Sequence, residues 1–141
     1  MVPKFLFAYG TLRPGFRNYP CVAPFTRRSF AATADGLQLL LAPSAGFPFA
    51  VPAPGARATG TLIQLDKPRV ELALEACDWL ESYDAERDTG LYLRRTTTVT
   101  SAETGVVEAW VYLAGPRVGT TALAKVPGND WAQVEPRRWG T

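Results

Sequence analysis

The sequence predicts an α+β fold in which a mostly antiparallel or mixed sheet curls over one helix. Five segments have the composition of β-strands, and only one segment has convincing helical periodicity. The alternation of strand and helix that is typical of a doubly wound parallel sheet is missing. With 141 residues the chain has the length of one domain, and we expect residues 1–141 to form it.

Strands are predicted where apolar or β-branched runs end in turn residues. The first run, residues 4–9, ends at Gly10. Residues 39–60 are rich in proline and glycine and predict a long loop with short extended pieces, because each proline removes a backbone donor. The last two strands flank SAETG, in which Gly105 suits a hairpin turn, so we expect them to be antiparallel neighbours. The expected strands are residues 4–9, 36–41, 58–65, 91–100 and 106–113.

Residues 68–81, PRVELALEACDWLE, predict the helix, with Pro68 at a favourable position in the first turn. At 100° per residue, three acidic side chains fall within about 60° of one another and form a polar face. Three apolar side chains lie on the other side of the helix and are expected to be buried. The polar face is Glu71, Glu75 and Asp78, and the apolar side is Val70, Leu74 and Cys77.

Glu81 is the carboxylate with an unusual predicted direction. On the helical wheel it lies about 20° from both Val70 and Leu74, where apolar side chains point. A carboxylate among apolar neighbours must be paired, protonated or used. Helix geometry leaves two interpretations open: a functional carboxylate, or a side chain at a frayed helix end that turns back to water. Six other acidic residues are interpreted as solvated surface residues: Glu71, Glu75, Asp78, Asp84, Glu86 and Asp88.

The absence of histidine restricts the possible chemistry most strongly. It excludes Ser-His-Asp and Cys-His catalysis and His-ligated zinc sites. Acid–base chemistry near neutral pH then depends on a carboxylate, lysine, tyrosine or cysteine whose pKa the fold has moved. The acidic loop DAERDTG lacks the ligand spacing of a calcium loop, and we expect no metal site.

Charge and hydropathy argue against nucleic-acid and membrane partners. The formal net charge is only +2, too small for a strong field towards a phosphate backbone. No stretch approaches the ~20 apolar residues of a membrane helix, and KFLFAY is too short for the core of a signal peptide, so we expect a cytoplasmic protein. Three isolated arginine pairs read as solvated surface: Arg27-Arg28, Arg94-Arg95 and Arg137-Arg138.

Cys21 and Cys77 stand 56 positions apart and show no metal or redox spacing. Two reduced structural thiols are therefore favoured over a disulfide.

The first strand leads into a turn, Tyr9-Gly10-Thr11-Leu12, that has two interpretations. Gly10 lets the backbone turn sharply or approach a ligand closely. Successive N–H groups in such a turn can form a concavity for a carboxylate or a developing oxyanion. Most glycines at strand ends merely turn the chain. Tyr92, at the start of the long strand after the acidic loop, reads as an aromatic residue that packs its ring.

Four motifs together resemble the gamma-glutamylcyclotransferase-like family. They are YGTLRPGFRN, ATGTLIQLD, CDWLESYDAERDTGLYLRRTTTV and VPGNDW, in this order, and the resemblance runs from about residue 4 to residue 131. It implies a small mixed β-barrel with flanking helices and a cavity that holds a γ-glutamyl group. It also implies an acid–base glutamate ahead of a Y-x-R strand, which falls on Glu81 and on Tyr92-Leu93-Arg94. Ser82 stands where relatives usually carry glycine.

The activity implied by the resemblance is conversion of a γ-glutamyl amino acid or γ-glutamyl amine to 5-oxoproline and the free amine. This is a C–N bond cleavage with cyclisation, of acyltransferase or lyase type, that uses no cofactor and no metal. Glu81 would be the catalytic acid–base group, and Tyr9, Gly10, Thr11, Leu12 and Tyr92 would bind the substrate. The alternative is a non-catalytic module that binds a small molecule or a partner. The sequence leaves the leaving group and the oligomeric state open.

Overall fold

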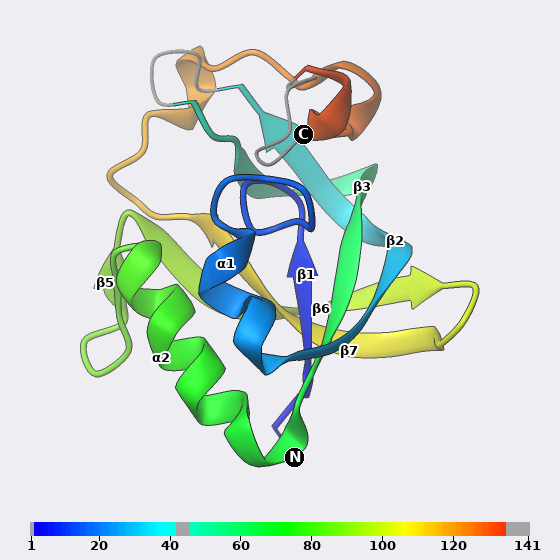
Figure 1. Cartoon of the computed structure of the whole chain (residues 1–141). Helices are drawn as coiled ribbons and strands as arrows, with labels where there is room; N and C mark the ends of the chain where they lie inside the picture. The colour runs from blue at the N-terminus through cyan, green and yellow to red at the C-terminus, as the bar shows by residue number, and fades with distance from the viewer. Residues whose placement is uncertain (1, 42–45, 135–141) are drawn as a thin grey trace.

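The computed structural model describes residues 2–41 and 46–134. In this part of the chain, five strands close into a barrel in the order β1-β3-β2-β6-β7, and helices α1 and α2 lie side by side against it (Figure 1). Neighbouring strands are antiparallel except β1 and β7, which pair in parallel at Leu6 and Trp110 and close the barrel. The fold is therefore a small mixed β-barrel with flanking helices, as expected.

The elements follow the chain in a simple order. The strands are β1 (Phe5–Ala8), β2 (Thr26–Leu40), β3 (Phe49–Leu65), β4 (Tyr83–Asp84), β5 (Thr89–Gly90), β6 (Tyr92–Ser101) and β7 (Gly105–Ala114). The helices are α1 (Tyr19–Val22) and α2 (Val70–Leu80). Short 3₁₀ turns occur at Ala23–Phe25, Lys67–Arg69, Thr120–Ala122, Pro127–Asn129 and Trp131–Gln133. No helix within the described ranges has the length and apolar character needed to cross a bilayer.

Two expectations about β2 and β3 are wrong. The predicted strand 36–41 is the end of a much longer strand, and the predicted loop 39–60 contains the first half of β3. The prolines are tolerated because the pairing is irregular beside them: the register passes from Asp35 opposite Arg57 to Leu37 opposite Pro52, which leaves extra residues of β3 bulged out. The β6–β7 hairpin agrees with the prediction, with Gly105 opposite Ser101.

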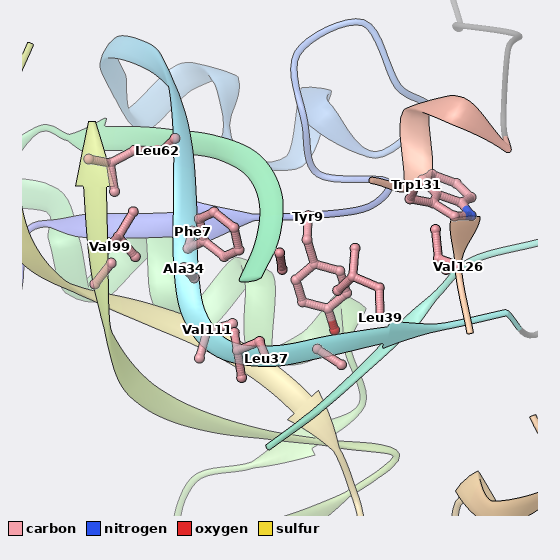
Figure 2. Close-up of a cluster of buried hydrophobic side chains, with 14 of the residues drawn as sticks. Phe7, Tyr9, Ala34, Leu37, Leu39, Leu62, Val99, Val111, Val126 and Trp131 are labelled. Atoms are coloured by element: carbon pink, nitrogen blue, oxygen red, sulfur yellow. The ribbon is translucent and has the colours of Figure 1, made fainter. Parts of the chain in front are cut away.

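Alternation along the strands divides the core into two clusters. In β1, Phe7 points into the barrel whereas Leu6 points out towards the helices, and both are fully buried. Figure 2 shows the inner cluster, in which Phe7 and Tyr9 lie among Leu37, Leu39, Leu62 and Val111. The outer cluster packs the apolar side of α2 on the barrel wall: Val70, Leu74 and Cys77 are buried, as its periodicity predicts.

Candidate active site

The residues proposed as a site from the sequence lie around one cavity. Glu81, Tyr92 and the turn from Tyr9 to Leu12 all line it. The cavity is narrow and open to solvent at its mouth, and its volume is about 20 Å³. Five further residues complete the wall and were not anticipated: Phe7, Ala8, Phe47, Pro48 and Tyr112. Five of the eleven lining residues are therefore aromatic.

Glu81 is placed by the end of α2. Its backbone N–H donates to the carbonyl oxygen of Cys77 at 2.8 Å, and its own φ of −84° and ψ of 4° end the helix. The side chain is half-buried and lines the cavity, rather than turning away into solvent. No described residue forms an ion pair with its carboxylate or donates a hydrogen bond to it. The carboxylate is thus held among apolar and aromatic neighbours without a fixed partner.

This environment changes the protonation of Glu81. Burial, followed by the charge of the nearby Cys21 thiolate, raises the pKa of the carboxyl to about 8. A carboxyl group with this pKa exchanges a proton readily near neutral pH. Paired surface carboxylates such as Asp88, whose pKa is lowered by Arg95, lack this property.

The turn after β1 is fixed by close packing at Gly10. A Cβ atom on Gly10 would lie 2.8 Å from Cγ of Pro48, which leaves no room for a side chain. The carbonyl oxygen of Gly10 accepts from the N–H of Arg13 at 3.1 Å and closes the turn. Within the described part of the chain, the backbone N–H groups of Gly10, Thr11 and Leu12 have no protein acceptor, although all three residues line the cavity.

The hydroxyl of Tyr92 is already hydrogen-bonded within the protein. Its hydroxyl donates to the carbonyl oxygen of Pro48 at 2.7 Å, so this proton is already in use. The hydroxyl of Tyr9 likewise donates to the carbonyl oxygen of Tyr112. Burial and, less strongly, the charge of Glu81 keep the pKa of Tyr92 above its ordinary value. Tyr92 thus holds Pro48 against Gly10, and its hydroxyl oxygen remains able to accept a hydrogen bond from a ligand.

A buried ion pair anchors α2 one turn before Glu81. Asp78 accepts from Nε and Nη2 of Arg94 at 2.9 and 3.1 Å and from the hydroxyl of Tyr112 at 2.6 Å. The Arg94 guanidinium also lies 4.6 Å from the ring centroid of Trp110. The interpretation of Asp78 and Arg94 as solvated surface residues is therefore wrong, because the two charges neutralise each other inside the structure. Arg137-Arg138 lies outside the described residues.

The loop after β1 contacts the segment around residues 130–131. Arg13 forms an ion pair with Asp130 at 3.1 Å and donates to Oγ1 of Thr61 at 3.2 Å. The ring centroids of Phe16 and Trp131 lie 5.5 Å apart. These contacts hold the turn that contains Gly10, and they give a physical reason for the first and last of the four sequence motifs.

Comparison with known proteins bears directly on this arrangement. Residues 6–133 match the profile of a family described as gamma-glutamyl cyclotransferase, AIG2-like. The chain belongs to this family. No curated protein sequence matches the chain significantly.

Solved structures show the same fold as this gamma-glutamyl cyclotransferase family member. An AIG2-like protein from Mus musculus superimposes with a TM-score of 0.71 at 21% identity, over 98% of this chain and 95% of that one. YkqA from Bacillus subtilis superimposes with a TM-score of 0.68 at 22% identity, over 95% of this chain. The match covers 41% of YkqA, so the chain spans about two fifths of that protein. A structure described as gamma-glutamyl cyclotransferase has a TM-score of 0.58 at 17% identity, over 86% of this chain and 68% of that one.

Ser82, which follows Glu81, is strained in this family member. Its φ is +55°, a left-handed conformation in which a glycine commonly ends a helix. We expect Ser82→Gly to raise the free energy of unfolding by about 0.5–1 kcal/mol, because the left-handed penalty disappears. Urea denaturation would measure this, with Ser82→Ala as the control that retains a Cβ and the strain. A Ser82→Gly protein no more stable than Ser82→Ala would contradict the expectation.

Proposed function

We propose that this protein is an enzyme that converts a γ-glutamyl amino acid or γ-glutamyl amine to 5-oxoproline and a free amine. The observation that carries the proposal is the half-buried Glu81 carboxyl, which has no partner among the described residues, in a cavity also lined by residues whose backbone N–H groups have no acceptor there. Family membership supports the same reaction class.

The reaction needs no nucleophile from the protein. The α-amine of the substrate attacks its own γ-carbonyl carbon, a new C–N bond closes the five-membered ring, and the bond to the leaving nitrogen breaks. Nucleophile and carbonyl belong to one molecule, so holding the glutamyl chain in a bent conformation supplies much of the acceleration. The aromatic wall formed by Phe47, Tyr92 and Tyr112 provides a rigid surface for that bend.

Glu81 handles the proton in this scheme. As a carboxylate it accepts a proton from the α-ammonium group and so frees the attacking lone pair. As a carboxylic acid it then donates that proton to the leaving nitrogen, which departs as a neutral amine, and the ring nitrogen releases its second extra proton to solvent. Both transfers are feasible because the pKa of about 8 lies close to the working pH.

The turn at Gly10 provides hydrogen-bond donors for the γ-carbonyl oxygen of the substrate. Negative charge develops on this oxygen as the amine attacks, and preorganised N–H donors stabilise it. Gly10, Thr11 and Leu12 line the cavity, and their N–H groups have no acceptor within residues 2–41 and 46–134. We assign them to the substrate oxygens, and we assign Tyr9 and Tyr92 to the cavity wall that positions the substrate.

The direct test is 5-oxoproline release from a panel of γ-glutamyl amino acids and γ-glutamyl amines, with α-glutamyl isomers as matched controls. We expect turnover of at least one γ-glutamyl compound and none of the α-glutamyl isomers, whose amine cannot close the same ring. Thermal stabilisation by 5-oxoproline with no turnover across the panel would contradict the proposal and favour a binding module.

A further inference from the structure

The two cysteines, far apart in the sequence, lie together in the fold. Cys21 is carried by α1 and Cys77 by α2, and these two helices are in direct contact (Figure 1). Both side chains belong to the outer hydrophobic cluster, in which Cys77 is fully buried and Cys21 is partly exposed. Each thiol is the largest influence on the pKa of the other, as expected for two side chains that lie close together in this cluster.

The pair is chemically asymmetric. The neighbouring Cys77 thiol lowers the pKa of Cys21 to about 7, although burial acts in the opposite direction. The neighbouring Cys21 thiol, together with burial, raises the pKa of Cys77 well above its ordinary value. Cys21 is thus the partly exposed thiolate that an oxidant can reach, and Cys77 is the buried thiol behind it.

We propose that Cys21 and Cys77 form a reversible redox pair, a modification site in which peroxide oxidation closes a disulfide between α1 and α2. The assignment differs from the expectation of two inert structural thiols, because the fold packs both cysteines into one cluster on two contacting helices. Their state in this structure is reduced.

The chemistry balances with hydrogen peroxide as the oxidant. The Cys21 thiolate attacks one peroxide oxygen, the O–O bond breaks, and hydroxide leaves, so that Cys21 becomes a sulfenic acid. The Cys77 sulfur then attacks the Cys21 sulfur, an S–S bond forms, and the S–O bond breaks. The Cys77 proton and the departing hydroxyl leave as water. Two thiols are oxidised and one peroxide is reduced to two waters.

The position of the pair links it to Glu81. The carbonyl oxygen of Cys77 accepts the backbone N–H of Glu81 at 2.8 Å, so a shift of Cys77 is transmitted directly to the end of α2. The charge of the Cys21 thiolate also contributes to the raised pKa of Glu81. A disulfide removes that charge, because neither sulfur can then ionise. Oxidation is therefore expected to alter the site as well as the thiols.

Counting thiols in the whole protein tests the proposal. The purified chain is treated with hydrogen peroxide, unfolded, alkylated with iodoacetamide, and its intact mass is measured before and after dithiothreitol. We expect both thiols to be lost together with the mass of two hydrogen atoms, in a monomeric chain, and both to return on reduction. In Cys77→Ser, the resolving thiol is gone, so we expect a Cys21 sulfenic acid that dimedone traps.

Three results would overturn the proposal: two alkylatable thiols after peroxide, stable addition of oxygen to Cys21 in the wild type, or a disulfide-linked dimer. Thiol counting in the wild-type protein tests the proposal even if Cys77→Ser fails to fold. A second readout depends on the proposed function: the midpoint of the pH–rate profile should move to lower pH in the oxidised enzyme and in Cys21→Ser. An unchanged midpoint in an enzyme whose thiols have closed would reject the link to Glu81 while leaving the redox pair in place.

Discussion

Replacement of Glu81 by glutamine is expected to lower kcat for 5-oxoproline release by about 10²-fold or more. Glutamine keeps the shape of the side chain and fills the same part of the cavity, but it neither accepts nor donates the proton that the reaction moves. The carboxyl has no ion-pair or hydrogen-bond partner among the described residues, so the substitution breaks no contact within that part of the protein. KM should therefore change much less than kcat.

The control for Glu81→Gln is Glu75→Gln, on the exposed side of the same helix. This variant removes the same charge from α2 without touching the cavity, and it should have the activity of the wild type. Circular dichroism and a thermal melt would confirm that both variants fold. If Glu81→Gln keeps the activity of the Glu75→Gln control, another group moves the proton and the proposed mechanism is wrong.

The pH dependence of the same two proteins gives an independent check. In the proposed mechanism the base is the Glu81 carboxylate, so kcat/KM for the wild type should rise with pH until the carboxyl is deprotonated near its pKa of about 8. In Glu81→Gln this rise should be absent. A wild-type profile that is already flat above pH 5 would show that the carboxyl has an ordinary pKa.

Stability should follow the opposite direction from activity. The folded pKa of Glu81, about 8, lies above its reference value of 4.5, so between these values the folded state holds a proton that the unfolded state has released. The contribution of Glu81 to stability is therefore complete below pH 4.5 and is lost as the pH rises to about 8. Glutamine does not titrate, so Glu81→Gln does not lose stability in this pH range and should have a higher free energy of unfolding than the wild type at pH 8. Such a gain is expected where a functional group is held in an unfavourable environment.

The general architecture was predictable because periodicity reports burial directly. The α2 helix repeats apolar residues at helical spacing, and Glu81 follows on that apolar side. The periodicity alone therefore marks Glu81 as an unusual carboxylate, and Glu81 lines the cavity. The β6–β7 hairpin has a turn glycine and alternating residues. Those signals lie within one element and need no knowledge of distant contacts.

The missed features lie where the local sequence carries a weak or misleading signal. Asp78 lies on the polar face of α2 by periodicity, and nothing in its own neighbourhood indicates that Arg94 and Tyr112 surround it. The first half of β2 was missed because its inward positions are Ala32 and Ala34, whose small side chains give a weak apolar signal although both are buried. In a narrow barrel, residues as small as these fit the interior.

Replacement of Asp78 by asparagine is expected to reduce the free energy of unfolding by about 3–5 kcal/mol. The exposed fractions of the Asp78 and Arg94 side chains are only 12% and 16%, so the substitution leaves the guanidinium buried without its counter-charge. The Tyr112 hydroxyl can still donate to the amide oxygen, so the loss comes mainly from the stranded charge. The total free energy of unfolding of a small domain is about 5–15 kcal/mol. Urea denaturation would therefore show a large fall in the urea concentration at the unfolding midpoint.

The matched control is Asp35→Asn, which breaks an ion pair of similar length on the surface. Arg57 lies 2.7 Å from Asp35, but 66% and 67% of the two side chains are exposed, and the expected change is below about 0.5 kcal/mol. A loss below about 1 kcal/mol for Asp78→Asn would mean that water reaches Arg94 and that the pair is not truly buried.

A double variant separates the charge from the shape. If the stranded guanidinium causes the loss, adding Arg94→Met to Asp78→Asn removes the uncompensated charge, and the double variant should be no less stable than Asp78→Asn alone. Additive losses would instead indicate that the contact of Arg94 with the Trp110 ring, rather than its charge, stabilises this region. The ion pair can affect the proposed reaction only through the position of Glu81. A fall in kcat in either variant is therefore expected only if the end of α2 moves.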